Sequence, residues 1–130
     1  MMSLLIVDDD PLLRTALQFV FQQDYAVQVA DSAEAALACF AADCPDAVLL
    51  DLILPGMSGM QLLQQISQEY PRIPVIVISG AAINSDAVTA FQNGAADFVR
   101  KPFDVQELRL RVARALKWYA MANFREEPSW

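Results

Sequence analysis

Aspartates stand directly after two of the most apolar runs in this chain of 130 residues. Residues 4–7 are followed by Asp8-Asp9-Asp10, and residues 47–50 are followed by Asp51. A carboxylate at such a place is either a cap on the end of a strand or a working group at the edge of a core. The other polar residues that follow apolar runs decide between these two interpretations.

Two further apolar runs end in a hydroxyl and an ammonium group. Residues 75–78 are followed by Ser79, and residues 97–100 are followed by Lys101. In a parallel sheet the carboxyl ends of all strands lie along one edge, and ligands bind outside that edge, where the strand order reverses. The order of these runs therefore predicts that carboxylates, a hydroxyl and an ammonium converge on one small area.

Such a cluster is suited to phosphoryl transfer. Three neighbouring carboxylates repel one another, and a hard divalent cation such as Mg²⁺ relieves that repulsion. A cation beside Asp51 also draws in an anionic phosphoryl donor, and an aspartate can act as a nucleophile that forms an acyl phosphate. Lys101 and Ser79 could each contact one phosphoryl oxygen, which adds positioning and charge neutralisation.

The plainer interpretations differ from residue to residue. Asp10 precedes Pro11 and is typical of an N-cap with proline at the first helical position. Ser79 alone and a Lys-Pro pair alone are both common in turns. All four features at four strand ends, in one consistent order, indicate a working site rather than a set of caps.

The apolar runs alternate with stretches of helical spacing. The runs are residues 4–7, 25–30, 47–50, 75–78 and 97–100. The apolar positions of the predicted helices are Leu13, Leu17, Val20 and Phe21; Ala35, Ala36, Cys39 and Phe40; Leu62, Leu63 and Ile66; Ile83, Ala87, Ala90 and Phe91; and Val105, Leu108, Val112, Ala115 and Tyr119. Buried runs alternating with helices predict a doubly wound α/β domain with a parallel sheet.

Composition narrows the class of protein. With 55% hydrophobic and 19% charged residues, the chain suits one folded domain, predicted over residues 1–122, with a tail or linker over 123–130. The net charge of −7 argues against direct nucleic-acid binding. The sequence has no apolar run of membrane-spanning length and no basic stretch typical of a signal peptide, and its two cysteines suit a reducing compartment. A cytoplasmic protein without a membrane partner is expected.

The chain contains no histidine. This excludes a Ser-His-Asp triad, a Cys-His pair and a histidine-ligated zinc ion within the chain. If the site handles phosphate by way of a phosphohistidine, a partner must supply that histidine.

Four motifs carry a resemblance to a known family. They read "LLIVDDDPLLR", "PDAVLLDLILPGMSG", "PVIVISG" and "NGAADFVRKPF". Over residues 3–121 the chain resembles the receiver domain of bacterial two-component response regulators. The resemblance implies a flavodoxin-like, five-stranded parallel sheet in the order 2-1-3-4-5 with five helices. It also implies that a histidine kinase or phosphotransfer protein donates a phosphoryl group to Asp51.

The same resemblance implies a set of metal ligands. Asp9 and Asp51 would bind Mg²⁺ directly, together with the main-chain carbonyl of Ile53, and Asp8 would act through water. The cofactor expected from the resemblance is therefore Mg²⁺.

The resemblance also implies a switch and an output. Ser79 and Lys101 would contact the phosphoryl oxygens, and Ser79 and Phe98 would be the switch residues. A tyrosine is commoner at the position of Phe98, so switching here would depend on ring packing. An output domain or protein is implied as a partner, and a homodimer is left open.

Three other functions are alternatives to a phosphoacceptor receiver domain. A phosphatase of the haloacid-dehalogenase type needs a second aspartate two residues after the nucleophile, where this chain has Ile53. A dinucleotide-binding module needs a glycine-rich turn after the first strand, where this chain has Asp8-Asp9-Asp10. A degenerate receiver that serves only as an interaction module is disfavoured by the intact Ser79 and Lys101. The chain is not expected to be an enzyme, beyond catalysing its own phosphorylation and dephosphorylation.

Overall fold

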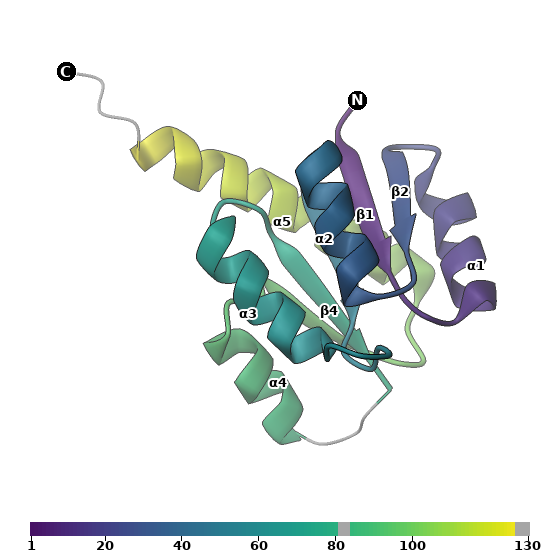
Figure 1. The fold of residues 1–130 in the computed structure, drawn as a ribbon. Helices are drawn as coiled ribbons and strands as arrows, with labels where there is room; N and C mark the ends of the chain where they lie inside the picture. Colours follow the sequence, from purple (N-terminus) through teal and green to yellow (C-terminus); the bar gives the residue numbers. More distant parts are fainter. Residues whose placement is uncertain (81–83, 127–130) are drawn as a thin grey trace.

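The computed structural model describes residues 1–80 and 84–126 as five strands that alternate with five helices (Figure 1). The elements are β1 (Ser3–Val7), α1 (Pro11–Phe21), β2 (Ala26–Ala30), α2 (Ala33–Ala42), β3 (Ala47–Asp51), α3 (Gly59–Glu69), β4 (Val75–Ser79), α4 (Asn84–Gln92), β5 (Asp97–Arg100) and α5 (Val105–Glu126). Ile83, predicted to mark the fourth helix, lies outside the described residues, as do residues 127–130 of the predicted tail.

The sheet has the order β2-β1-β3-β4-β5, and every pair of neighbours is parallel. The predicted doubly wound fold and strand order are therefore confirmed. Val7, the last residue of β1, pairs with Leu50 in β3 and with Ala30 in β2. The carboxyl ends of the strands consequently lie along one edge, which is called the acidic edge from here on.

Two apolar clusters cover the two faces of the sheet. Leu4 and Ile6 of β1, with the residues of the other strands that point to the same side, pack against α1 and α5. Leu5 and Val7 point to the opposite side of the sheet, against α2, α3 and α4 (Figure 1). The three central strands β1, β3 and β4 are almost entirely buried, which explains their continuous apolar sequences. The polar residues at or just after the ends of these strands are thus held by a buried core.

Local sequence signals set the helix ends. Asp10 is the N-cap of α1 and Pro11 is the first helical residue, as predicted. The Oδ1 atom of Asp10 accepts hydrogen bonds from the N–H groups of Leu12 and Leu13. After α4 the chain turns at Gly94, whose φ of 103° favours glycine. A side chain at Gly94 would also collide with Ser67 on α3.

The ends of β3, β4 and α5 lie further along the chain than the sequence predicted. β3 and β4 include Asp51 and Ser79 as their last residues, because both pair with the neighbouring strand. The helix α5 continues through Glu126, into the segment predicted as a tail. The physical reason is that the sequence has neither glycine nor proline between Pro102 and Pro128. The division into a domain over 1–122 and a tail stays a prediction.

A helix that crosses a membrane must be both long and apolar. None of the helices within residues 1–80 and 84–126 meets that requirement.

Candidate functional site

Three carboxylates meet at the acidic edge. Asp8 and Asp9 follow β1, Asp51 ends β3, and one ligand oxygen from each lies within 4.8 Å of the others. Asp8 and Asp51 are only 2% and 6% exposed, whereas Asp9 is open to solvent. Three carboxylate oxygens, partly sheltered and partly accessible, are a donor set that fits a hard cation such as Mg²⁺.

Asp51 is fixed at both of its carboxylate oxygens. Oδ1 accepts a hydrogen bond of 3.0 Å from the N–H of Ile53, and Oδ2 lies 2.7 Å from Nζ of Lys101. The chain after Asp51 folds back so closely that a side chain at Gly59 would collide with the main chain of Asp51 and Leu52. The Gly59 N–H donates to the Leu52 carbonyl at 2.9 Å and closes this turn.

Lys101 follows β5, and its ammonium group lies beside the carboxylates. Its main-chain N–H donates to the Ser79 carbonyl at 2.9 Å, which aligns the end of β5 with the end of β4. Its Nζ also lies 3.7 Å from Oδ2 of Asp8. Partial burial lowers the pKa of Lys101, but the hydrogen bond and charge of Asp51 and the charge of Asp8 outweigh it, so the pKa is raised. Lys101 is therefore a permanent cation at this site.

The surroundings of Asp8 destabilise its ionised form. Burial raises its pKa, and the charge of Asp51 adds to the rise, while a 2.8 Å hydrogen bond from the Asp10 N–H and the charge of Lys101 oppose it. The net direction is upward, so the ionised form of Asp8 is disfavoured where it stands. A second positive charge would relieve this, which agrees with the donor set.

The third aspartate of the run has another task. The Asp10 side chain is occupied in capping α1, and it is not among the three carboxylates that converge. Within the part of the chain that the structure describes, no hydrogen bond or ion pair holds the Asp9 carboxylate. Of the three consecutive aspartates, Asp8 and Asp9 face the site and Asp10 starts the helix.

Comparisons with known proteins agree with this geometry. Residues 4–113 match the family model of the response regulator receiver domain. The chain belongs to the response regulator receiver domain family.

Relatives of this receiver domain are longer proteins. It is 36% identical over 115 residues to the DNA-binding transcriptional regulator NtrC of Salmonella typhimurium, covering 88% of this chain and 24% of that protein. It is 38% identical over 120 residues to the transcriptional regulatory protein CseB of Streptomyces coelicolor, covering 92% of this chain and 51% of that protein. The chain thus spans about a quarter to a half of the length of these curated relatives.

Solved structures share its fold. A receiver domain protein from Methanospirillum hungatei superposes with a TM-score of 0.89 at 25% identity, over 94% of this chain and 98% of that one. NtrX from Brucella abortus superposes with a TM-score of 0.87 at 33% identity, over 93% of this chain and 28% of that one. The phosphatase alternative finds no support among these relatives.

The remaining predicted residues of the receiver domain border the cluster. Ser79 is completely buried at the end of β4. Ile53 presents its main chain to Asp51, while its side chain is 66% exposed. Phe98 lies on β5, partly buried against the α2–α4 side of the core.

One side chain at the acidic edge was not predicted. Arg14, in the first turns of α1, donates a 2.8 Å hydrogen bond from Nη1 to the main-chain carbonyl of Asp8. Its sequence signal is slight, since Arg14 merely ends the first of the four motifs, six residues after Asp8. The contact depends on how α1 folds back over the strand end, which spacing alone does not reveal.

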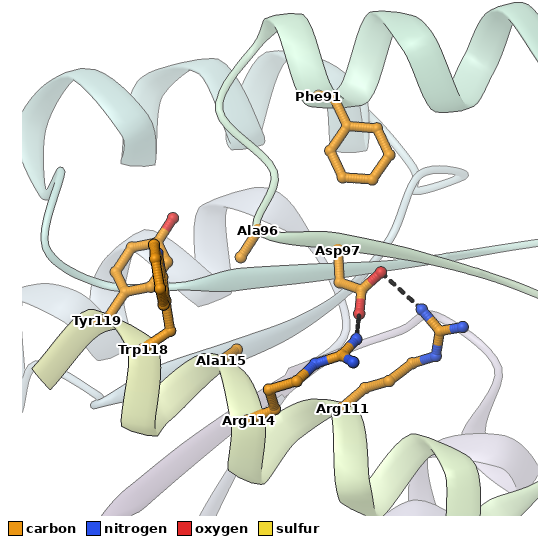
Figure 2. Close-up of a pocket in the computed structure, with 8 residues that line it drawn as sticks. All are labelled: Phe91, Ala96, Asp97, Arg111, Arg114, Ala115, Trp118 and Tyr119. Carbon is orange, nitrogen blue, oxygen red and sulfur yellow. Dashed lines mark hydrogen bonds and ion pairs between the residues drawn. The ribbon is translucent and has the colours of Figure 1, made fainter. Parts of the chain in front are cut away.

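A second feature of the receiver domain lies away from the acidic edge. A cavity of about 380 Å³ opens between α4, β5 and α5, and the aromatic rings of Phe91 and Trp118 stand on its two sides (Figure 2). These two side chains are 50% and 62% exposed. On its floor Asp97 pairs with Arg111 at 2.7 Å and with Arg114 at 3.5 Å. This feature is called the α4–α5 groove below.

Proposed function

We propose that Asp51 is the phosphoacceptor of this receiver domain and that a histidine kinase or phosphotransfer protein is its donor. One observation carries the proposal: a buried carboxylate at a strand end, 2.7 Å from an ammonium and clustered with two other carboxylates. In the transfer, a carboxylate oxygen of Asp51 attacks phosphorus, and the bond from phosphorus to the donor nitrogen breaks with its electron pair leaving on the histidine.

The carboxylates fit a Mg²⁺ ion. Asp9 and Asp51 would hold it directly with the main-chain carbonyl of Ile53, and Asp8 would act through water. When bound, the ion supplies neutralisation of the negative charge that builds up as phosphate approaches aspartate. The residues themselves orient the acceptor, because Ile53 N–H and Lys101 restrict how the Asp51 carboxylate can turn.

Lys101 and Ser79 are the proposed contacts of the phosphoryl oxygens. Lys101 already donates a hydrogen bond to the Asp51 carboxylate. Ser79 is the last residue of β4, the strand beside the one that ends in Asp51. A phosphoryl group adds a charge of about −1.5 to −2 and several strong acceptors. It would draw Ser79 and Lys101 toward Asp51 and so bias the packing of the Phe98 ring, which lies on β5, the strand that precedes Lys101.

The proposed switch ends at the α4–α5 groove. Phe98 also lines a neighbouring cavity with Phe91 and Arg111, and those two residues line the α4–α5 groove as well. A change in the packing of the Phe98 ring would therefore alter a cavity whose lining is shared with the groove. Amide chemical shifts should therefore change on phosphorylation along β5 and in the exposed turns of α4 and α5. Shifts confined to the loops around Asp51 would contradict this propagation.

Partners follow from the same reasoning. An output domain or protein would bind the α4–α5 groove, and the domain would act on no substrate besides its own phosphoryl group. A cytoplasmic location stays a prediction from the sequence.

A second copy of the chain is a further candidate occupant of the groove. Asp97 and Glu107 stand there beside Arg111 and Arg114, and two copies related by a twofold axis could pair these opposite charges. Sedimentation of the phosphorylated and unphosphorylated protein at several concentrations tests this. The expected result is a dimer that is favoured by phosphorylation.

The phosphoacceptor proposal is tested with acetyl phosphate and Mg²⁺. Mass spectrometry should detect the addition of one phosphate to the wild-type protein and none to Asp51→Asn, which keeps the shape of the side chain but removes the nucleophilic charge. Chelation of the metal should also prevent the reaction. Equal labelling of wild type and Asp51→Asn would exclude Asp51 as the acceptor.

A further inference from the structure

Arg14 connects α1 to the acidic edge without touching a carboxylate. Its half-buried guanidinium donates to the Asp8 carbonyl at 2.8 Å, and its own N–H donates to the Asp10 carbonyl at 2.9 Å. The loop that carries Asp9 is therefore bonded to one residue at both of its ends. Other surface arginines pair with carboxylates, as Arg109 does with Asp24 at 2.8 Å.

Asp8 is held at every polar group of its main chain and at its carboxylate. Its N–H donates to the Ala30 carbonyl at 3.1 Å, and its Oδ1 accepts from the Asp10 N–H at 2.8 Å. Arg14 supplies the donor for the one remaining main-chain group, the carbonyl. Without it, that carbonyl would have to turn toward another donor, and the peptide plane between Asp8 and Asp9 would turn with it.

The position of Asp9 depends directly on that peptide plane. In the part of the chain that the structure describes, no side-chain bond holds Asp9, so its carboxylate is aimed by its main chain alone. A charge-assisted hydrogen bond from a guanidinium is stronger and more directional than a neutral one.

We propose that Arg14 is a positioning residue for the Mg²⁺ site, which orients the Asp8–Asp9 peptide so that both carboxylates face the cation. The inference rests on the proposed function of the acidic edge and adds a residue to it. Groups that orient metal ligands from outside the ligand set typically change metal affinity by about tenfold to a hundredfold when they are removed. Arg14 would act on affinity, and not on the chemistry at Asp51.

The test is Mg²⁺ binding measured by calorimetric titration, with Mn²⁺ electron paramagnetic resonance as a second readout. Arg14→Met keeps the apolar stem and should weaken binding about tenfold. Arg14→Lys, which restores the charge and a donor, should recover most of that loss. At saturating Mg²⁺ the rate of phosphorylation by acetyl phosphate should stay within about twofold of wild type in both variants, because the nucleophile is untouched.

Arg109→Met is the matched control, because it removes an arginine with a hydrogen bond of the same length from α5, and it should leave Mg²⁺ affinity unchanged. An affinity for Arg14→Met equal to that of wild type overturns the proposal, even if the variant unfolds more easily. If Arg14→Met does not fold, Arg14→Gln takes its place with the same two outcomes. Absence of Mg²⁺ binding by the wild-type protein would overturn the metal site itself, which separates the two failures.

Discussion

The acidic edge and the α4–α5 groove both collect charged side chains, but they balance the charges in opposite ways. At the acidic edge three carboxylates share the ammonium of Lys101. In the groove one carboxylate, Asp97, is shared by Arg111 and Arg114, and Arg111 also pairs with Glu107 at 2.8 Å. The first region has more negative than positive charge. In the second region the opposite charges pair with one another.

The acidic edge and the α4–α5 groove also differ in how far their side chains are exposed to solvent. Two of the three carboxylates of the acidic edge, Asp8 and Asp51, are below a tenth exposed, so the repulsion between them is poorly screened by water. The groove carries two exposed aromatic residues, Phe91 and Trp118, beside an ion pair whose arginine, Arg114, is exposed. An unbalanced, sheltered cluster is suited to binding a cation and a phosphoryl group. A balanced, open surface with exposed rings is suited to exchanging partners.

The largest effect is expected from a charge removed at the ligand position itself. Asp9→Asn should weaken Mg²⁺ binding by about tenfold or more, because a neutral amide replaces a carboxylate ligand of a hard cation. Asp10→Asn removes the same formal charge one residue away, but asparagine caps a helix as well as aspartate does, so affinity should stay within about twofold.

Calorimetric titration of the two variants separates coordination from general electrostatics. Equal losses in Asp9→Asn and Asp10→Asn would mean that net negative charge, and not a defined ligand, attracts the metal.

A medium effect is expected on stability, with opposite signs in the two regions. Without Mg²⁺, Asp8→Asn should stabilise the domain by about 1 kcal/mol, because a buried carboxylate with a raised pKa becomes neutral and keeps its acceptor for the Asp10 N–H. Asp97→Asn should destabilise it by about 1 kcal/mol, because Arg111 and Arg114 lose their shared partner.

Urea unfolding in a chelating buffer measures both changes. Saturating Mg²⁺ should abolish the advantage of Asp8→Asn and leave the deficit of Asp97→Asn in place, since only the first concerns the metal site. The same sign for both variants in the absence of metal would show that the acidic edge is not electrostatically unbalanced.

The fold and the site members could be predicted from the sequence where a strand is followed directly by a polar residue. Continuous apolar runs predicted buried parallel strands, and the polar residue at each run's end predicted what the acidic edge would contain, since parallel strands present equivalent ends to one edge. The site members Asp8, Asp9, Asp51 and Lys101 therefore could be found without the structure. Their convergence is observed, while their roles in metal binding and phosphoryl transfer stay proposals.

Features that depend on how elements fold over one another could not be predicted in this way. The contact of Arg14 with the Asp8 carbonyl needs the orientation of α1 relative to β1. Phe91 fits the apolar spacing of α4, yet it is half exposed and lines the α4–α5 groove beside β5, the edge strand of the sheet. Helical spacing identifies an apolar face but does not say how much of it is covered.

The smallest effect is expected on the lifetime of the phosphorylated state, and it concerns Ile53. An acyl phosphate is lost when water attacks phosphorus in line, so side chains beside that path affect the rate. Ile53 follows Asp51 by two residues, its N–H holds the carboxylate, and its exposed side chain cannot hydrogen-bond a water molecule. Its apolar side chain is expected to shield the phosphorus and to keep self-dephosphorylation slow.

Ile53→Asn should therefore accelerate loss of phosphate by about threefold, since an amide at this position can orient an attacking water and positioning lowers barriers of this kind. The measurement is the decay of phosphorylated protein after removal of acetyl phosphate, at constant Mg²⁺. Val88→Asn makes a comparable change at an exposed position on α4 and should leave the decay unchanged. Equal or slower decay in Ile53→Asn would refute shielding by the side chain. Control would then belong to the main chain after Asp51, where Gly59 and the Ile53 N–H fix the approach to the carboxylate.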